Sequence, residues 1–352
     1  MKNALYIQAM NVHVGGGRSL LLPLLEAITP EHSIVALVDQ RIELPAELPK
    51  SLSVIRVPPS VRGRWLAERW LKGVVTANDV VLCFGNLPPL NGLKGRVLVF
   101  VQNRLLVEEV SLRTFSLKPR MRLFIERIWL RRYAGHANYF VVQTPSMRRL
   151  LATKLRIPES TIVAWPFTAN PTNFSQVSLT TSRQVQTSND FDFIYPASGD
   201  PHKNHRNLVE AWVSLAKDGF FPSLCLTIDT VKYPILWKWI DLETKKTGLK
   251  IFNLGFLQHE DLLLTYSRAK ALIYPSLLES FGLPLLEAQV AGLPVVAAEL
   301  DYVRDILSPA QVFDPNSPLS IARAVKRFLG NPESDLKLLN ANEFLERTLR
   351  QR

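Results

Sequence analysis

The first half of the chain alternates short apolar segments with longer segments of helical periodicity. The apolar segments are rich in Val, Ile and aromatic residues, a composition typical of buried strands. Strands are predicted at 4–10, 32–39, 51–57, 79–85, 96–102, 138–143 and 161–167. Residues 18–28 show helical spacing after a loop at 11–17. Because strands that alternate with helices form βαβ units, this pattern predicts a parallel sheet.

The second half repeats the alternation after a polar segment. Strands are predicted at 191–197, 223–229, 249–255, 270–276 and 294–299, with helices at 205–218, 233–246, 259–269 and 284–292. Residues 176–189 are rich in Ser and Thr and contain almost no large apolar residue, which is typical of a linker.

This organisation predicts two Rossmann-like α/β domains. We place them at 1–175 and 191–352, joined by a linker at 176–190, and expect the last helices to pack back on the first domain. Two such domains place the expected ligand site in the cleft between them.

Composition narrows the class of protein. A chain of 352 residues with 47% apolar and 21% charged residues is globular, which excludes disordered, collagen-like and disulfide-stapled chains. Both cysteines lie in apolar runs, and no Cys or His spacing indicates a zinc site. Asp190 and Asp192 open a predicted strand, so we interpret them as exposed aspartates. We therefore expect neither a bound metal nor a cofactor.

Positive charge is concentrated in the first half. The net charge is +11, of which residues 1–175 carry +12 and residues 176–352 carry −1; residues 104–156 alone carry +9. This asymmetry indicates an anionic partner, either a nucleic acid, a phosphorylated substrate or a membrane surface. No apolar run approaches the ~20 residues of a membrane span, and the first residues do not form a signal peptide, so we expect a cytoplasmic protein.

Residues 118–133 are predicted to form a basic amphipathic helix. Apolar residues recur there at helical spacing, at Met121, Phe124, Ile125, Ile128 and Trp129. The positions around them hold Arg120, Arg122, Arg127, Arg131 and Arg132. Such a helix either binds an anionic membrane surface, with Trp129 as an anchor, or packs its apolar face into the core. The regional charge favours the peripheral membrane interpretation. Nucleic acid is not expected, because no binding motif for it is present.

The segment at 274–294 combines a phosphate-type site with two carboxylates. A loop holding Glu279 and Gly282 leads into a helix that starts near Pro284, and Glu287 follows one turn later. Loop amides over a helix N-terminus bind anions, and carboxylates accept hydrogen bonds from sugar hydroxyls. The segment therefore suits a ligand with phosphate and hydroxyl groups, or else a helix start whose acidic residues complement the dipole.

The same segment resembles the donor-site motif of glycosyltransferase family 4, the retaining enzymes of GT-B fold. Glu279 and Glu287 have the E-x7-E spacing within ESFGLPLLEA, and the resemblance extends over 193–328, with a looser likeness in the first half. It implies that Glu287 binds the ribose of a nucleotide sugar and that Glu279 contacts the transferred sugar. It also implies that backbone amides meet sugar and phosphate at Ser280, Phe281, Gly282 and Leu283.

The resemblance assigns further residues around the cleft. Lys203, in PASGDPHKNHRN, would neutralise the leaving diphosphate, which fits a reaction that depends on stabilising an anion. The arginine that precedes this lysine in the family is missing, since its place is held by Ala197 and Ser198; Arg206 or His205 are the candidate substitutes.

Two segments of the first half complete the expected site. Gly16 and Gly17, in the triplet at 15–17, would let the backbone approach the donor phosphate, although a tight turn explains glycines equally well. Gln102, Asn103 and Arg104 end a strand where the family carries a residue that faces the donor sugar, so we expect them to face the cleft and the acceptor.

The resemblance thus implies a retaining glycosyltransferase of mannosyltransferase-like hexosyl type, with Lys203 and Glu279 as catalytic residues. It would move a sugar from a nucleotide-sugar donor to a lipid-linked saccharide in bacterial surface polysaccharide (O-antigen) assembly, on the inner face of the plasma membrane. Two alternatives remain open: a nucleotide-sugar 2-epimerase of the same fold, which would convert the donor alone, and a non-catalytic nucleotide-sugar-binding protein.

Overall fold

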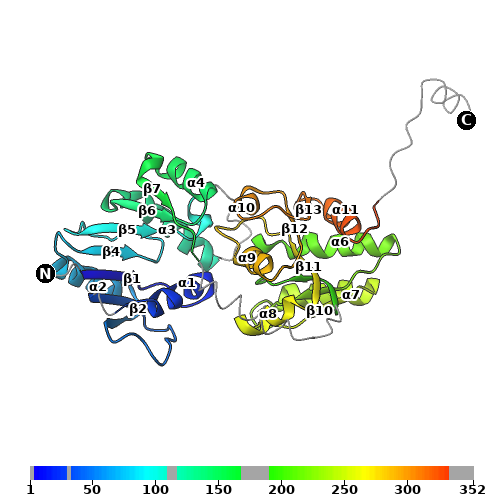
Figure 1. The fold of residues 1–352 in the computed structure, drawn as a ribbon, viewed down its shortest axis with the longest axis horizontal. Helices are drawn as coiled ribbons and strands as arrows, with labels where there is room; N and C mark the ends of the chain where they lie inside the picture. Colours follow the sequence, from blue (N-terminus) through cyan, green and yellow to red (C-terminus); the bar gives the residue numbers. More distant parts are fainter. Residues whose placement is uncertain (1–3, 30–32, 109–116, 168–189, 333–352) are drawn as a thin grey trace, which may run out of the picture.

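The computed structural model describes residues 4–29, 33–108, 117–167 and 190–332. Residues 176–189 of the predicted linker and any helix after residue 332 lie outside these residues. Within them the chain forms two parallel β-sheets with helices beside them, one sheet from each half of the sequence (Figure 1). This confirms the predicted fold class; the predicted domain limits stay a prediction.

The first sheet has seven strands in the order β3-β2-β1-β4-β5-β6-β7, and the pairings are parallel. The strands are β1 (Ala4–Ala9), β2 (Ser33–Asp39), β3 (Leu52–Val57), β4 (Val80–Cys83), β5 (Arg96–Phe100), β6 (Tyr139–Val142) and β7 (Ile162–Ala164). The strand order reverses between β1 and β4, so the loops that follow these two strands diverge and leave a crevice at the carboxyl edge of the sheet.

Four α-helices accompany this sheet among the described residues: α1 (Gly15–Glu26), α2 (Val61–Val74), α3 (Leu117–Arg132) and α4 (Pro145–Leu155). Periodicity did not single out α2 and α4, yet both begin with capping residues. Ser60 accepts a hydrogen bond from the Gly63 amide, and Thr144 accepts one from Met147. Two apolar clusters cover the two faces of the sheet.

The second sheet has six strands in the order β10-β9-β8-β11-β12-β13, again with parallel pairings. Its strands are β8 (Phe191–Tyr195), β9 (Leu224–Leu226), β10 (Ile251–Asn253), β11 (Ala269–Tyr274), β12 (Val295–Ala298) and β13 (Gln311–Phe313). Its helices are α6 (His205–Lys217), α7 (Pro234–Thr247), α8 (His259–Tyr266), α9 (Leu283–Val290), α10 (Asp301–Arg304) and α11 (Pro318–Phe328).

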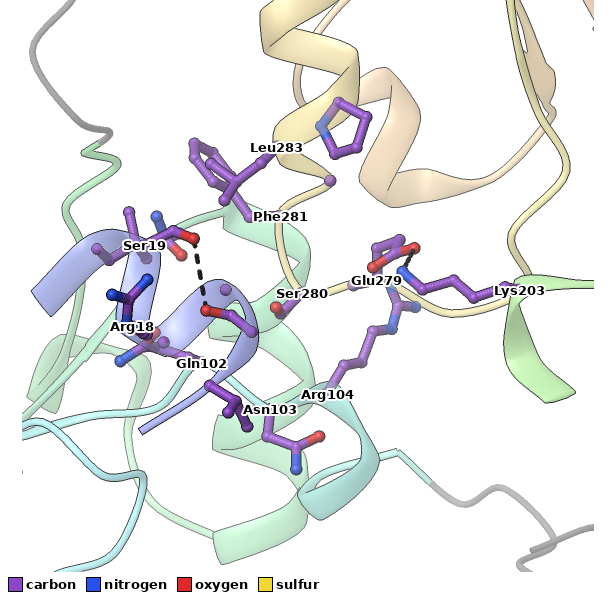
Figure 2. Close-up of a pocket in the computed structure, with 18 of the residues that line it drawn as sticks. Arg18, Ser19, Gln102, Asn103, Arg104, Lys203, Glu279, Ser280, Phe281 and Leu283 are labelled. Carbon is purple, nitrogen blue, oxygen red and sulfur yellow. Dashed lines mark hydrogen bonds and ion pairs between the residues drawn. The ribbon is translucent and has the colours of Figure 1, made fainter. Parts of the chain in front are cut away.

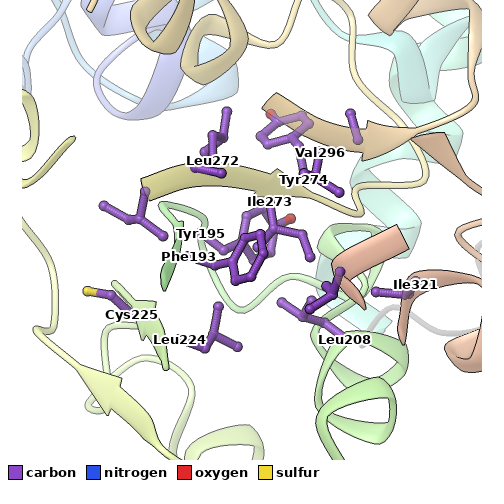
Figure 3. Packing of buried hydrophobic residues seen from close by; sticks show 14 of the residues in the cluster. Phe193, Tyr195, Leu208, Leu224, Cys225, Leu272, Ile273, Tyr274, Val296 and Ile321 are labelled. Atoms are coloured by element: carbon purple, nitrogen blue, oxygen red, sulfur yellow. The ribbon is translucent and has the colours of Figure 1, made fainter. Parts of the chain in front are cut away.

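The core of the second half is built around β8 and β11 (Figure 3). Phe193 packs edge-on against Trp212 of α6, and Tyr195 packs edge-on against Tyr274. Trp212 is fully buried. Burial of its indole N–H is tolerated because this group donates to the Pro222 carbonyl, 2.9 Å away. This packing fixes the carboxyl ends of β8 and β11, from which the candidate site residues extend.

The two halves touch through α9, α10 and the loops beside them. The Leu283 side chain packs against the apolar cluster that contains Leu20 of α1. The Ser146 amide of α4 donates to Asp305, 3.0 Å away, just after α10. Residues of the first half therefore contact the start of α9 and the residue that follows α10.

The predicted amphipathic helix exists as α3, but its apolar row faces outward. Met121, Phe124, Ile125 and Ile128 are 53–65% exposed, whereas Leu123 and Leu130 on the opposite side are buried. The interpretation that the apolar row packs into the core is therefore wrong.

The arginines of α3 do not form one free basic face either. Arg127 donates to the carbonyls of Leu105 and Glu108, each at 2.9 Å, and Arg122 pairs with Glu126 at 2.8 Å. Trp129 is also not an outward anchor, because its indole N–H donates to a backbone carbonyl inside the domain. Arg120, Arg131 and Arg132 are exposed beside the apolar row.

Candidate functional site

A cleft of about 620 Å³ lies between the two halves and is lined by both. The first half contributes the loops after β1, β4 and β5 and the start of α1; the second half contributes the loops after β8 and β11 and the start of α9. Each loop follows the carboxyl end of a parallel strand, which is where open α/β sheets bind ligands. The predicted donor-site residues from both halves lie around this cleft (Figure 2).

Lys203 and Glu279, which both line the cleft, meet as an ion pair (Figure 2). The Lys203 Nζ lies 2.5 Å from Glu279 Oε1, and the Tyr274 hydroxyl donates to the same oxygen at 3.0 Å. Burial by itself raises the pKa of Glu279, but the charge and the hydrogen bond of Lys203 outweigh it and hold the pKa below its ordinary value. Glu279 is therefore ionised and neutralises the lysine.

Buried tyrosines hold the two loops that carry this pair. The Tyr195 hydroxyl donates to the Lys203 carbonyl at 2.7 Å, and the Tyr302 hydroxyl donates to the Ser276 carbonyl at 2.7 Å. Asn204, in the left-handed conformation, donates to the Pro275 carbonyl at 3.1 Å. Because these bonds satisfy the loop carbonyls, the ion pair sits on a fixed backbone.

The amides predicted to meet sugar and phosphate lie at the start of α9. Gly282 is the N-cap in the left-handed conformation (φ +78°), and Pro284 lies in the first turn. Ser280, Phe281, Gly282 and Leu283 line the cleft. The left-handed conformation favours glycine at position 282, and a Cβ there would lie 3.0 Å from the Leu285 side chain, which would have to shift.

Glu287 lies one turn into α9, as predicted, and is buried. Its Oε2 accepts a hydrogen bond from the Tyr266 hydroxyl at 2.8 Å, and its Oε1 lies 3.6 Å from the His259 Nδ1. Burial raises the pKa of Glu287, although Tyr266 and His259 act in the opposite direction. The carboxylate is thus held in place at the wall of the cleft by side chains that sequence reasoning missed.

The glycine triplet belongs to α1 and not to a loop, because the helix begins at Gly15, three residues earlier than predicted. Gly16 has open space where a side chain would lie, and a Cβ on Gly17 would lie 3.2 Å from Val12. The first turn of this 12-residue helix contains no acidic residue and has no side-chain cap, so its amides face the cleft unopposed. Arg18, which was not predicted, also lines the cleft.

Gln102 and Asn103 line the cleft as predicted, on a turn fixed by Asn86. The Asn86 side-chain oxygen accepts from the backbone amides of both residues, at 2.5 and 2.9 Å, and Asn86 itself has φ +71°. The Gln102 side chain donates to the Phe84 carbonyl. A non-glycine residue at positive φ is uncommon, and its hydrogen bonds here explain why it is tolerated.

Arg104 lines the cleft, but it does not point freely into it. Its side chain is 8% exposed and binds Asp301 of the other half, with Nη1–Oδ1 at 2.9 Å. It also donates to the Glu279 carbonyl at 3.3 Å and pairs with Glu108. The expectation that Arg104 faces a substrate is corrected: it joins the two halves and braces the loop of Glu279.

Neither candidate substitute for the missing arginine extends toward the cleft. The Arg206 guanidinium stacks over the Trp239 ring, 4.7 Å from its centroid, and is absent from the cleft lining. His205 is buried, and burial together with Lys203 lowers its pKa to about 3, so it carries no charge at neutral pH. Arg18 is a further cation in the cleft lining, and its Nη2 lies 3.5 Å from the Glu43 carbonyl oxygen and 4.0 Å from the Glu43 carboxylate.

The described residues contain no cluster of three or more Cys, His, Asp or Glu suited to a metal. The helices of those residues include none with the length and apolar character to cross a membrane.

Part of the chain is similar in sequence to known glycosyltransferases. Residues 180–343 match the family model "Glycosyl transferases group 1". O-antigen chain mannosyltransferase B of Escherichia coli is 30% identical over 139 residues, 39% of this chain and 36% of that protein. O-antigen chain mannosyltransferase RfbU of Salmonella typhimurium is 30% identical over 96 residues, 27% and 26% of the two chains. The matched region thus spans about a third or less of these two relatives.

Solved structures resemble nearly the whole chain. An alpha,alpha-trehalose 6-phosphate synthase from Burkholderia multivorans aligns with a TM-score of 0.71 at 13% identity, covering 94% of this chain and 90% of that one. HepE from Anabaena, in complex with UDP and glucose, aligns with a TM-score of 0.63 at 13% identity, covering 93% and 90%. Residues 180–343 therefore match the group 1 glycosyl transferases, and the chain as a whole has the two-domain GT-B fold.

Proposed function

We propose that this protein is a glycosyltransferase that moves a sugar from a nucleotide-sugar donor to a saccharide acceptor. The observation that carries the proposal is the arrangement of Lys203, Glu279 and Glu287 around one cleft, within the residues that match the group 1 family. An ammonium, a helix N-terminus and two carboxylates are complementary to a diphosphate joined to hydroxyl-rich groups.

The proposed reaction proceeds with retention. Lys203 and the amides at the start of α9 bind the diphosphate and stabilise its charge as the glycosidic bond breaks. Glu279 and Glu287 bind hydroxyls of the sugar and the ribose. On the acceptor side of the cleft Gln102 and Asn103 offer amides, which cannot remove a proton, so the departing phosphate takes the proton of the attacking hydroxyl.

The donor sugar is proposed to be mannose and the acceptor a lipid-linked saccharide of a surface polysaccharide. The relatives named above support mannose and a surface polysaccharide, because both are described as O-antigen chain mannosyltransferases. The first half is proposed to hold the acceptor, and the enzyme to work in the cytoplasm at the inner face of the membrane.

An anionic membrane surface is the proposed further partner of α3. Its outward row of Met121, Phe124, Ile125 and Ile128 is flanked by the exposed Arg120, Arg131 and Arg132. Such a helix inserts apolar side chains at the headgroup boundary, and each cation near anionic lipid adds about 1 kcal/mol to the free energy of membrane binding.

The donor site is tested by thermal melting of the protein with UDP, GDP, ADP, dTDP and their common sugars. A nucleotide at 100 times its dissociation constant adds about 2.7 kcal/mol to the free energy of unfolding. Wild type should be stabilised by one nucleotide, Glu287→Ala should not, and Glu260→Ala, a change to an exposed glutamate of α8 outside the cleft lining, should respond like wild type. Equal shifts in all three proteins would refute the assignment of Glu287.

Turnover separates the two alternatives. A 2-epimerase converts the nucleotide sugar without an acceptor, and a non-catalytic binder is stabilised by the donor but releases no nucleotide diphosphate. Release of the diphosphate that depends on added acceptor supports transfer, and its absence over a panel of lipid-linked saccharides would contradict it.

A further inference from the structure

We propose that a second pocket, in the first half of the chain, binds an uncharged sugar unit of the acceptor. This rests on the proposed function and adds the position and the chemical class of the acceptor unit. The pocket has a volume of about 390 Å³ and lies between the carboxyl ends of β1 to β3 and the helices α2 and α3. That size is within the range of small-molecule sites.

The pocket adjoins the donor cleft. Asn11 and Arg122 line both cavities, so a ligand in the pocket extends toward the donor site without leaving the protein surface. Asn11 is fixed by its side-chain N–H, which donates to the Gly85 carbonyl at 2.9 Å. An acceptor held here is therefore directed at the cleft where the transferred sugar would lie.

The polar end of the pocket contains a histidine that can receive a ligand hydroxyl. The His13 Nδ1 is buried and has no hydrogen-bond partner in the described part of the chain; the nearby Asp39 Oδ2, at 3.7 Å, is too distant to be one. Burial and the charge of Arg41 lower the pKa of His13, so at neutral pH it presents an uncharged ring. A buried nitrogen without a partner is costly, and a sugar hydroxyl would satisfy it.

The charges around the pocket indicate a neutral ligand. Each of its guanidinium groups already has a carboxylate partner: Arg41 with Asp39 at 2.7 Å, Arg64 with Glu68 at 3.6 Å, and Arg122 with Glu126 at 2.8 Å. The charge of each guanidinium that lines the pocket is therefore balanced by a carboxylate. The paired groups still offer N–H donors and carboxylate oxygens to hydroxyls.

The exposed indole of Trp65 forms the apolar wall, because the Arg64 guanidinium lies over the Trp129 ring, 4.3 Å from its centroid. Trp65 of α2 is 48% exposed, and Trp129 of α3 is held by its N–H bond to the Pro88 carbonyl. The C–H face of a pyranose ring packs on such a surface while its hydroxyls reach the polar end. A flat apolar wall opposite paired polar groups suits a sugar ring better than a lipid chain or a phosphate.

Saturation-transfer NMR with methyl glycosides of mannose, glucose, galactose and N-acetylglucosamine tests the pocket without requiring turnover. We expect transfer to at least one glycoside, a loss of at least tenfold in affinity in Trp65→Ala, and wild-type binding in Trp70→Ala, the same change on the same helix outside the pocket. His13→Leu removes the accepting nitrogen and should also weaken glycoside binding. This second variant tests the pocket even if Trp65→Ala fails to fold.

The outcomes distinguish this proposal from the donor assignment. Nucleotide-induced melting shifts should be unchanged in Trp65→Ala, because the cleft residues are intact. A protein that binds nucleotide but none of the glycosides, or whose glycoside signals survive both variants, would overturn the pocket and leave the donor site standing. Tighter binding of mannose 6-phosphate than of methyl mannoside would overturn the neutral class.

Discussion

Breaking the Lys203–Glu279 ion pair should strongly destabilise the second half, and Lys203→Met measures the cost of leaving the buried Glu279 carboxylate unpaired. The side chains are 17% and 13% exposed, so water screens the pair weakly. At the Nζ–Oε1 distance of 2.5 Å the Coulomb attraction is about 6–7 kcal/mol for an effective dielectric constant of about 20. The cost of desolvating both groups offsets part of this, and removing one partner of a buried pair costs about 3–5 kcal/mol.

The assay is urea unfolding followed by tryptophan fluorescence, with a matched surface pair as control. Lys245 pairs with Asp241 at 2.7 Å on α7, but its side chain is 73% exposed, so Lys245→Met should cost about 0.3–0.5 kcal/mol. Lys203→Met/Glu279→Gln should recover much of the loss, since no unpaired charge then remains buried. If Lys203→Met cost no more than Lys245→Met, the pair would be solvated and this reasoning would be wrong.

The pH dependence gives the same test a sign. In wild type the lowered pKa of Glu279 means that the pair stabilises the fold above the unfolded pKa, about 4.3, and that this is lost as pH falls through the folded pKa. In Lys203→Met the burial that raises the pKa of Glu279 is opposed only by the smaller effects of the Ser276 hydrogen bond and of His202, so we expect this pKa to rise. The cost of burying the unpaired Glu279 carboxylate is complete at neutral pH and is relieved as this carboxylate protonates. The difference in the free energy of unfolding between wild type and Lys203→Met should therefore shrink toward pH 4.

Three other changes test the cleft and the surface around it. Arg104→Met leaves Asp301 without its partner across the two halves and displaces the loop of Glu279. It should therefore lower kcat by tenfold or more with little change in the KM of the acceptor. A kcat equal to that of wild type in steady-state assays would contradict this. Arg18→Ala should weaken nucleotide binding several-fold in titration calorimetry, and unchanged affinity would remove Arg18 from the phosphate site. Phe124→Ser should reduce co-sedimentation with anionic vesicles at low salt, whereas neutral vesicles should bind neither protein appreciably; retention equal to wild type would show that α3 is not the contact.

Much of the fold was predictable because strands and helices have different apolar periods. The two sheets follow from runs such as 96–100 and 269–274, whose residues are apolar at almost every position because both faces of the sheet are covered. The start of α9 was also predictable, since Gly282 and Pro284 are positional signals that depend on local backbone geometry alone.

What could not be predicted depends on the relation between distant segments. The spacing of Met121, Phe124 and Ile128 identifies one face of a helix, but only packing decides whether that face is turned inward. Arg104 at the end of a strand gives no sign that its partner, Asp301, lies 197 residues later on α10. Tyr274 likewise looks like a core residue in sequence, although its hydroxyl reaches Glu279.

The ion pair also links donor binding to the position of Glu279. Before a ligand arrives, Lys203 is neutralised by Glu279, so a diphosphate can gain the full attraction of the ammonium only by drawing it away from the carboxylate. Glu279 then keeps Tyr274 as a donor but loses its charge partner in a buried site, which is unfavourable unless new donors replace it. The hydroxyls of the transferred sugar are such donors at Glu279, whereas a nucleoside diphosphate has only ribose hydroxyls, which the proposed site places at Glu287. In the proposed enzyme the intact nucleotide sugar should therefore bind more tightly than the product diphosphate, which favours release of the product after transfer.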